Sequence, residues 1–479
     1  MIITGLALGT VLGAVLQRGR FCVTGFLRDI YLRRTMRPFT ALLIVISIQA
    51  IGVQLLTSLG IIQPEFDPFA PLAVIGGSLL FGIGIVLAGG CASGTWYRAG
   101  EGLVGSWIAL IAYALSAAAM KTGALTGLND WGRSIQTEHV SIAADTGINT
   151  WVFILGLSLG TAVLAWRYTA SAQNQPQPRP QQTATAVGSR FAAPIPLYRA
   201  AVLVGVIGVV AWPLSAAAGR NDGLGITTPS KNVVNYLVTG ESSFLDWGAL
   251  LVLGILAGSL VAALSTGEFR VRVPDSRTAV ASLIGGVFMG IGASWAGGCT
   301  VGNGMVQTSL FSYQGWIALA FTTLGVWLAA KFYLAPSTRG SAPAQDQPTL
   351  NDSTDQLPSA SLVDANRGTT ALATRPAPSF QAIDLGLETT APSREVRALG
   401  EGRYSLDSRG DVCPFPLLKL KNAVATLEPG DVISIVFDCT QATDAIPSWA
   451  AENGHSILDF VQLGPAEWEI TLRLYAVAS

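Results

Sequence analysis

Hydrophobic and polar residues follow one another along this chain in long blocks. Apolar runs of about 17–20 residues recur up to residue 334, and each is long enough to cross a hydrocarbon core of about 30 Å as a helix. The runs lie at about residues 1–17, 40–59, 71–88, 103–120, 150–167, 198–216, 245–264, 280–297 and 315–334. The pattern therefore predicts a polytopic α-helical membrane protein with about nine spans in residues 1–334.

The charges between the runs predict how the spans are oriented. Residues 18–37 contain six arginines and one aspartate, and residues 168–198 contain two arginines and no acidic residue. Residues 60–70 and 121–149 contain more acidic than basic side chains. Because loops rich in Lys and Arg stay on the cytoplasmic side, we expect multi-pass insertion into the inner membrane, with the N-terminus outside and the C-terminus in the cytoplasm.

The sequence Gly-Gly-Cys occurs twice, at residues 89–91 and 297–299, after apolar runs with matching glycines. Trp-Ile-Ala-Leu also recurs, at 107–110 and 316–319, which indicates an internal duplication. In the expected topology an inward-running span reaches the first copy and an outward-running span reaches the second. The repeats are therefore predicted to be inverted, as in transporters that bind substrate near the membrane midplane.

Adjacent glycines permit two structures at these points. Positive φ and close backbone approach would let each Gly-Gly-Cys segment end its helix and form a re-entrant segment inside the protein. The alternative is that the glycines only allow continuous helices to pack closely. Because two glycines precede a cysteine in both copies, we favour the re-entrant interpretation.

Two polar stretches interrupt the apolar pattern. Residues 173–186 are polar and Pro-rich and predict an unpacked connector, within the wider segment 168–198, between the membrane halves. Residues 335–402 are rich in Pro, Ser, Thr, Ala and Asp and predict a flexible linker.

The C-terminal residues 403–479 have a different pattern. Short strands are expected at 404–406, 432–437, 456–461 and 467–474, and helices at 417–427 and 444–452. This β-α-β-α-β-β order predicts a small two-layer α/β domain in the cytoplasm.

Composition narrows the classes of function. Hydrophobic residues make up 50% of the chain and charged residues 12%, and the mean hydropathy is +0.47. The net charge of −1 and the lack of a basic surface pattern give no indication of nucleic-acid binding. The two histidines and five scattered cysteines have no metal or haem spacing, so we expect no metal, no cofactor and no disulfide framework. His139 is expected in a loop and His455 on the surface of the C-terminal domain.

Cys413 lies just before the first predicted helix of this domain. A thiol there meets the positive end of the helix dipole, and unpaired backbone N–H groups stabilise a thiolate. Lys419 and Lys421 add positive charge further along. We therefore interpret Cys413 as a reactive sulfur rather than a packing residue, and Cys439 as a small buried hydrophobic residue.

Residues 406–424, LDSRGDVCPFPLLKLKNAV, resemble the Cys-Pro-x-Pro signature of the TusA-like (SirA-like) sulfur-carrier family. The resemblance covers essentially the whole C-terminal domain. It implies that Cys413 carries sulfur as a persulfide or a related adduct and passes it to an acceptor, with sulfurtransferase or thiosulfate-processing activity as an open possibility.

The membrane region resembles the YeeE/YedE family, which includes thiosulfate-uptake proteins. The similarity lies in Gly-Arg-Phe-Cys at 19–22 and in the two Gly-Gly-Cys segments. The family implies an hourglass-shaped protein with inverted repeats, whose substrate path is marked here by Cys22, Cys91 and Cys299. Phe-Arg at 269–270 replaces Phe-Cys at 21–22 in the second half, so the set of thiols is asymmetric.

Physical chemistry is consistent with such a path. An anion that enters a low-dielectric path needs donors to replace its water, and helix N-termini and weakly donating thiols provide them. Gly90, Gly298, Asn303 and Arg98 are supporting candidates because they adjoin the repeated motif. Arg98 could instead form an ion pair or lie at the membrane interface.

We therefore expect a transporter that takes up thiosulfate, or a related small sulfur anion, and delivers its sulfur to Cys413. Its partners would be the anion, membrane lipids and a cytoplasmic sulfur-acceptor protein. Two alternatives remain: transport of another sulfur or selenium species, and a membrane-anchored sulfurtransferase whose thiols relay persulfide covalently.

Overall fold

The computed structural model describes residues 2–66, 68–173, 194–334, 396–400, 402–411 and 413–475. Contacts join residues 1–335 and 394–479 in one unit. The expected connector and most of the expected linker lie outside the described residues.

Nine helical stretches of the described chain are long and apolar enough to cross a membrane. They are Ile3–Leu32, Arg37–Ser58, Pro71–Gly100, Val104–Thr122, Thr150–Ala170, Leu197–Ala216, Trp247–Ser265, Ser276–Trp295 and Tyr313–Tyr333. The apolar runs read from the sequence are therefore confirmed as candidate spans.

Two of these stretches are interrupted. The first contains α1 (Ile3–Arg18) and α2 (Val23–Leu32), and the third contains α4 (Pro71–Leu87) and α5 (Ala92–Gly100). The other long helices are α3 (Arg37–Ser58), α6 (Val104–Thr122), α9 (Thr150–Gln173), α10 (Leu197–Ala216), α12 (Trp247–Ser265), α13 (Ser276–Trp295) and α14 (Tyr313–Tyr333). The shorter elements are α7 (Thr126–Arg133), α8 (Ile142–Thr146), α11 (Thr227–Thr239), the 3₁₀-helix η1 (Ser242–Phe244) and the π-helix η2 (Gly302–Gln307).

Local sequence explains several helix starts. Proline occupies the first turn of α3 and α4, where its missing N–H costs nothing. The Asp246 side chain caps α12 by accepting from the Ala249 N–H at 2.7 Å. The Ser312 hydroxyl caps α14 by accepting from the Gly315 N–H at 3.0 Å.

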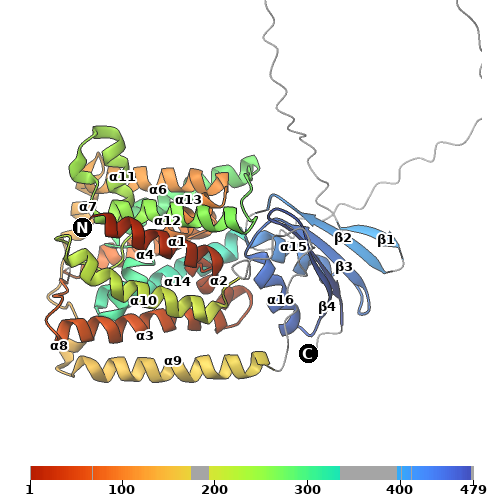
Figure 1. The fold of residues 1–479 in the computed structure, drawn as a ribbon, viewed down its shortest axis with the longest axis horizontal. Coiled ribbons are helices and arrows are strands. Elements are labelled where there is room, and N and C mark those ends of the chain that lie inside the picture. Colours follow the sequence, from red (N-terminus) through yellow and green to blue (C-terminus); the bar gives the residue numbers. More distant parts are fainter. Residues whose placement is uncertain are drawn as a thin grey trace, which may run out of the picture. The chain divides into compact units, whose positions relative to one another are not determined.

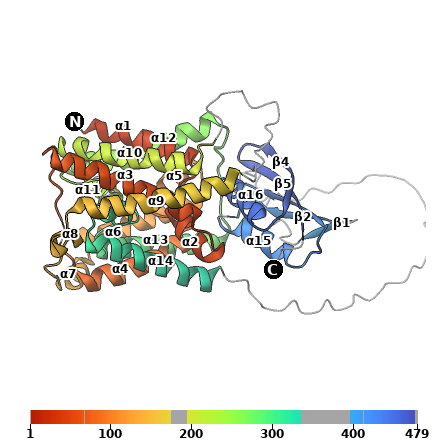
Figure 2. The same cartoon turned by 90° about the horizontal axis from the view of Figure 1, so that it is seen from below.

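Helices α1 and α12 lie side by side (Figures 1 and 2). Gly5, Gly9 and Gly13 of α1 face the backbone of α12, where a Cβ atom on Gly9 would come within 2.1 Å of the Leu251 carbonyl oxygen. The repeated glycines therefore allow backbone-to-backbone contact, which is the packing that small residues at four-residue spacing permit.

Helices α4 and α13, which precede the two Gly-Gly-Cys segments, pack antiparallel. A Cβ on Gly77 would come within 2.7 Å of the Gly292 carbonyl oxygen, and a Cβ on Gly84 within 2.8 Å of that of Gly285. Gly77 and Gly285 are equivalent in the duplication, as are Gly84 and Gly292. Each repeat thus presents the same pair of glycines to the other in reverse order. In addition α4 packs on α14, and α13 packs on α6.

Helix α9 lies along α3 at the edge of the helical region (Figures 1 and 2). Its large apolar side chains Leu155, Leu159 and Trp166 are 64%, 69% and 71% exposed. A surface of this kind suits contact with lipid chains.

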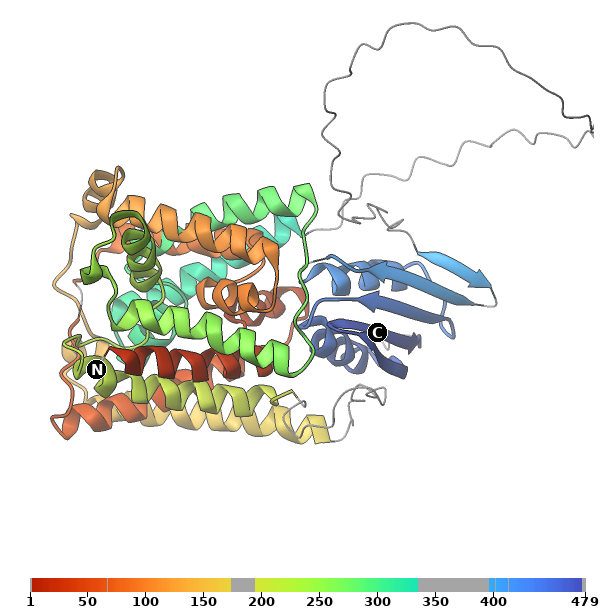
Figure 3. The same cartoon turned by 45° about the horizontal axis from the view of Figure 1, so that its top comes forward.

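The C-terminal domain contains strands β1 (Arg397–Gly400), β2 (Arg403–Ser408), β3 (Val432–Phe437), β4 (Ser456–Gly464) and β5 (Glu467–Arg473), with helices α15 (Phe415–Val424) and α16 (Ala442–Glu452). The sheet order is β1-β2-β3-β5-β4. Strands β2 and β3 are parallel, and the other neighbours are antiparallel. Both helices cover one face of the sheet (Figures 1 and 3). The predicted two-layer α/β domain is confirmed. The exposed four-residue strand β1 was not predicted and lies in the stretch assigned to the linker.

Candidate functional site

The three cysteines of the membrane region occupy equivalent positions at the start of helical turns. The carbonyl groups of Cys22, Cys91 and Cys299 accept the N–H of the residue four positions later, at 3.1, 2.8 and 2.8 Å. Cys22 precedes α2, and Cys91 precedes α5. All three thiols are free and buried. The first N–H groups of α2 and α5 have no partner within their helices, so they are available as donors beside these thiols.

The helix breaks before the two repeated cysteines have the same cause. Gly89 has φ +72° and Gly297 has φ +78°, a conformation that side chains disfavour. The second glycine of each copy, Gly90 or Gly298, leaves space for a nearby side chain. A Cβ on Gly90 would lie 3.1 Å from an Arg98 nitrogen, and one on Gly298 would lie 2.8 Å from the Asn303 amide oxygen.

Cys22 and Cys91 come together, although 69 positions separate them in the chain. Their thiols lie on the same side of the first turn of α5, next to Gly94. A Cβ on Gly94 would lie 3.4 Å from the Cys91 sulfur and 4.0 Å from the Cys22 sulfur. The Cys91 sulfur is also 3.4 Å from the Ser93 hydroxyl.

Tyr113 lies near both Cys91 and Cys299. Its side chain is fully buried and donates to the Thr227 hydroxyl at 2.9 Å. Sequence reasoning did not select Tyr113. The only signal was a phenol hydroxyl inside an apolar span, which is common wherever a partner is available.

Arg98 and Asn303, two of the supporting candidates, bind the two Gly-Gly-Cys turns. Arg98 is 6% exposed and donates to the Gly89 carbonyl and to the Cys22 sulfur, the latter at 3.5 Å. Asn303 donates to the carbonyls of Ala296 and Gly298 at 2.9 and 3.1 Å. The Asn303 amide oxygen accepts from Gln314 at 3.0 Å. The amide group of Asn303 is thus bonded to other protein groups. Arg98, in contrast, places a positive charge beside the Cys22 thiol.

Cys413 precedes α15, as predicted, but it forms a disulfide with Cys439, with a Cα–Cα distance of 6.4 Å. The prediction that Cys439 is only a small buried hydrophobic residue is therefore wrong. The cause is the parallel pairing of β2 and β3, because carboxyl ends of parallel strands meet at one edge of a sheet. Both cysteines follow such an end.

The two lysines near Cys413 bind groups other than its thiol. Lys419 forms an ion pair with Asp411, and Lys421 donates to the Leu32 carbonyl at 3.2 Å. Burial lowers the pKa of Lys421, and the nearby positive charge of Arg33 lowers it further.

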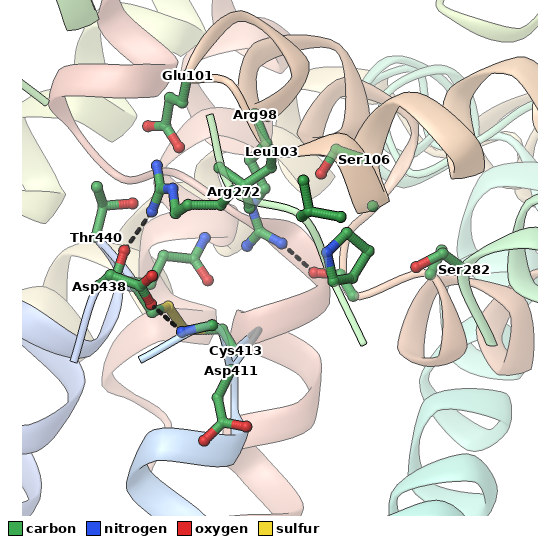
Figure 4. A pocket seen from close by; sticks show the side chains of 18 residues that line it. Arg98, Glu101, Leu103, Ser106, Arg272, Ser282, Asp411, Cys413, Asp438 and Thr440 are labelled. Atoms are coloured by element: carbon green, nitrogen blue, oxygen red, sulfur yellow. Dashed lines mark hydrogen bonds between the residues drawn. A yellow bond between two sulfur atoms is a disulfide. The ribbon is translucent and has the colours of Figure 1, made fainter. Parts of the chain in front are cut away.

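Two arginines of the membrane region supply positive charge instead. Figure 4 shows Arg98 and Arg272 beside a pocket that Cys413 also borders. Arg272 donates to the Asp438 backbone carbonyl. Burial raises the pKa of the Asp438 carboxyl group, against the opposing effect of the Arg272 charge.

A second cavity is lined by both Cys22 and Cys413. It has five arginines and two aspartates in its wall: Arg20, Arg28, Arg33, Arg37, Arg199, Asp29 and Asp444. The excess of positive charge favours small anions there. Within the described part of the chain, no group of three or more His, Cys, Asp or Glu side chains is arranged to hold a metal ion.

Known proteins match both regions. The thiosulfate transporter TsuA of Escherichia coli (strain K12) is 46% identical over 330 residues, which cover 69% of this chain and 94% of that protein. The thiosulfate transporter TsuA of Spirochaeta thermophila (strain ATCC 700085 / DSM 6578 / Z-1203) is 32% identical over 344 residues, covering 69% and 98%. The putative sulfur carrier protein TsuB of Escherichia coli (strain K12) is 56% identical over 68 residues, which cover 14% of this chain and 91% of that protein.

Family profiles match the same two regions. The profile described as sulphur transport matches residues 18–328, and the profile described as sulfurtransferase TusA matches residues 404–474. The chain therefore belongs to the sulphur transport (YeeE/YedE) family and carries a TusA domain at its C-terminal end.

Proposed function

We propose that this protein takes up thiosulfate across the inner membrane along a path marked by Cys299, Cys91 and Cys22, and that Cys413 then receives its sulfane sulfur. The observation that carries this proposal is the position of Arg98. It donates to the Cys22 sulfur and also lines the pocket that Cys413 borders. One cationic group therefore connects the membrane thiols with the reactive cysteine of the C-terminal domain.

The chemistry of the path suits a soft dianion. N–H groups at the starts of α2 and α5, which have no partner within their helices, can replace water around sulfonate oxygens. The adjacent thiols add weak, polarisable donors for the terminal sulfur. Weak contacts also let the ion leave, because a substrate held tightly at one site does not move on.

The antiparallel packing of α4 on α13 supports the inverted-repeat arrangement. The reciprocal glycine contacts are those that a twofold axis between the repeats would generate. We infer that the two Gly-Gly-Cys segments enter the membrane from opposite sides and meet near its middle.

A pocket near the second segment suits entry from outside. It is lined by Lys121, Arg133, Lys231 and Gly297, together with other polar residues. Arg133 donates to the Trp295 carbonyl at 3.2 Å and so lies against the end of α13. Three cations beside the Cys299 segment would attract an anion before it loses its water.

The test is uptake of thiosulfate that carries separate labels on its two sulfur atoms, in proteoliposomes or cells. Cys91→Ala is compared with Cys413→Ala, a matched cysteine replacement outside the proposed path. We expect both labels to enter together through the wild-type protein. Cys91→Ala should abolish entry, whereas Cys413→Ala should retain the initial rate.

Entry of the terminal sulfur label alone would overturn transport of the intact ion. It would favour the covalent relay, in which a persulfide is trapped on Cys91. Equal uptake by Cys91→Ala and wild type would remove this cysteine from the path.

A further inference from the structure

Cys439 lies two residues after β3, in the loop that leads to α16. Its sulfur is bonded to that of Cys413, and both residues line the same pocket together with Arg98 and Arg272. Because the parallel strands β2 and β3 hold both loops at one edge of the sheet, the two sulfurs can meet without rearrangement of the strands. The proposed function uses Cys413 and leaves Cys439 without a role.

We propose that Cys439 is the resolving cysteine of the C-terminal domain and that it releases the sulfur taken by Cys413 as hydrosulfide. This inference rests on the proposed reaction of Cys413 with thiosulfate. It assigns the domain a reductive step in addition to carrying sulfur.

The reaction balances in two steps. The Cys413 thiolate attacks the terminal sulfur of thiosulfate, the S–S bond of thiosulfate breaks, and sulfite leaves with the electron pair. The persulfide on Cys413 takes up a proton. The Cys439 thiolate then attacks the inner sulfur, which is the Cys413 Sγ, and hydrosulfide leaves. Two thiolates, one thiosulfate and one proton give one disulfide, one sulfite and one hydrosulfide.

The geometry determines which sulfur Cys439 attacks. Attack on the outer sulfur would transfer the persulfide to Cys439, whereas attack on the inner sulfur forms the Cys413–Cys439 bond. The structure contains that bond. Hydrosulfide is also a good leaving group, because hydrogen sulfide is a stronger acid than an alkyl thiol.

The surroundings suit both halves of the reaction. The pocket brings two guanidinium groups near Cys413, and these favour thiosulfate as it arrives and sulfite as it forms. Cys439 is only partly buried. A cytoplasmic dithiol reductant can therefore reach the disulfide and reduce it by thiol–disulfide exchange for the next cycle.

The experiment is a single turnover with the full chain in detergent. The protein is reduced, freed of reductant without oxygen, and mixed with thiosulfate labelled at the terminal sulfur. Sulfite and hydrosulfide are quantified, and quenched samples are analysed by mass spectrometry for a Cys413 persulfide and for the Cys413–Cys439 disulfide. The proteins are wild type, Cys439→Ser, Cys439→Ala and the blank Cys413→Ala.

We expect wild type to release sulfite and hydrosulfide in equal amounts and to form the disulfide after a transient persulfide. Both Cys439 variants should release sulfite in the same burst but accumulate the labelled persulfide, with hydrosulfide reduced by about tenfold or more. The time course of wild type tests the same order of events if a variant fails to fold.

The outcomes separate this inference from the proposed function. If wild type releases no sulfite, the proposed reaction of Cys413 fails, and the inference fails with it. If wild type and the Cys439 variants release sulfite and hydrosulfide equally, Cys413 still reacts but Cys439 does not resolve its persulfide. A disulfide that never appears after thiosulfate is added overturns the inference in the same way.

Discussion

Several buried side chains of this protein form hydrogen bonds with backbone groups. Arg98 contacts a carbonyl of the first Gly-Gly-Cys turn and a thiol at once, so its charge and the shape of the turn depend on each other. His455 is also bonded to a backbone group. It was expected on the surface but is only 7% exposed. Its imidazole Nδ1 accepts the Tyr475 N–H at 3.3 Å, which requires a neutral ring nitrogen.

His455 should make the stability of the C-terminal domain depend on pH. Burial lowers its pKa, so the folded domain binds the proton less readily than the unfolded chain does. Stability is therefore complete above the unfolded pKa of about 6.5 and falls as the pH drops from there towards the folded pKa. His455→Gln, which keeps a polar side chain without a proton to gain, should flatten this dependence.

The measurement is the urea midpoint of residues 394–479 between about pH 7 and pH 5. This segment has its own hydrophobic core and matches most of a separate sulfur carrier protein, so it is suitable for study alone. If His455→Gln lost as much stability on acidification as wild type, other titrating groups would be responsible.

At the scale of elements, the membrane region depends on helices that touch through their backbones. Residues on α4 and α13 pair glycine with carbonyl in both directions, and α1 does the same against α12. In a membrane, where hydrophobic burial does not drive helices together, such contact allows dispersion forces to act over the whole interface.

Gly84→Leu should disrupt the contact between α4 and α13. Its Cβ alone would lie 2.7 Å from the Met289 backbone nitrogen, so the helices would have to separate. We expect a loss of about 1–3 kcal/mol or more in the free energy of unfolding, measured by thermal denaturation in detergent. Gly76→Leu on the same helix is the matched control, because the nearest atom to its Cβ is a Trp295 ring carbon at 3.9 Å. Equal melting of the two variants would contradict this role for Gly84.

At the scale of the whole molecule, one chain combines a membrane region with a sulfur-handling domain. Contacts between them include an ion pair of Arg33 with Glu452 at 2.8 Å and a hydrogen bond from Gln441 to the Tyr97 hydroxyl at 3.0 Å. Apolar contact adds to these polar ones, because the Phe415 ring lies 6.1 Å from the Tyr333 ring between centroids. The covalent connection would also keep the domain at a high local concentration beside the membrane region.

Separation of the chain into residues 1–335 and 394–479 tests this connection. Initial thiosulfate uptake should be unchanged, while sulfite release inside the cell should fall when both pieces are expressed at low levels. Higher expression of the second piece should restore it by mass action. If low-level expression of the separate pieces matched the intact chain, the contacts alone would hold the domain in place.

Much of the site could be predicted from particular residues. Glycine precedes both repeated cysteines where the backbone has a positive φ, and that conformational requirement is local. The position of Cys413 just before a helix was also predicted from local sequence. The closeness of Cys22 to Cys91 and the position of Tyr113 were not predicted, because both depend on how α2, α5 and α6 pack.

The sequence by itself determined the membrane class, the nine apolar helices, the duplication and the α/β domain, because hydrophobic period and turn residues act over short distances. Only the tertiary structure decided that Cys439 meets Cys413. Their 26-residue separation crosses a helix and a strand, and the parallel pairing of β2 with β3 brings them to one edge. A contact between distant residues follows from the packing of whole elements, which the local sequence around either cysteine does not contain.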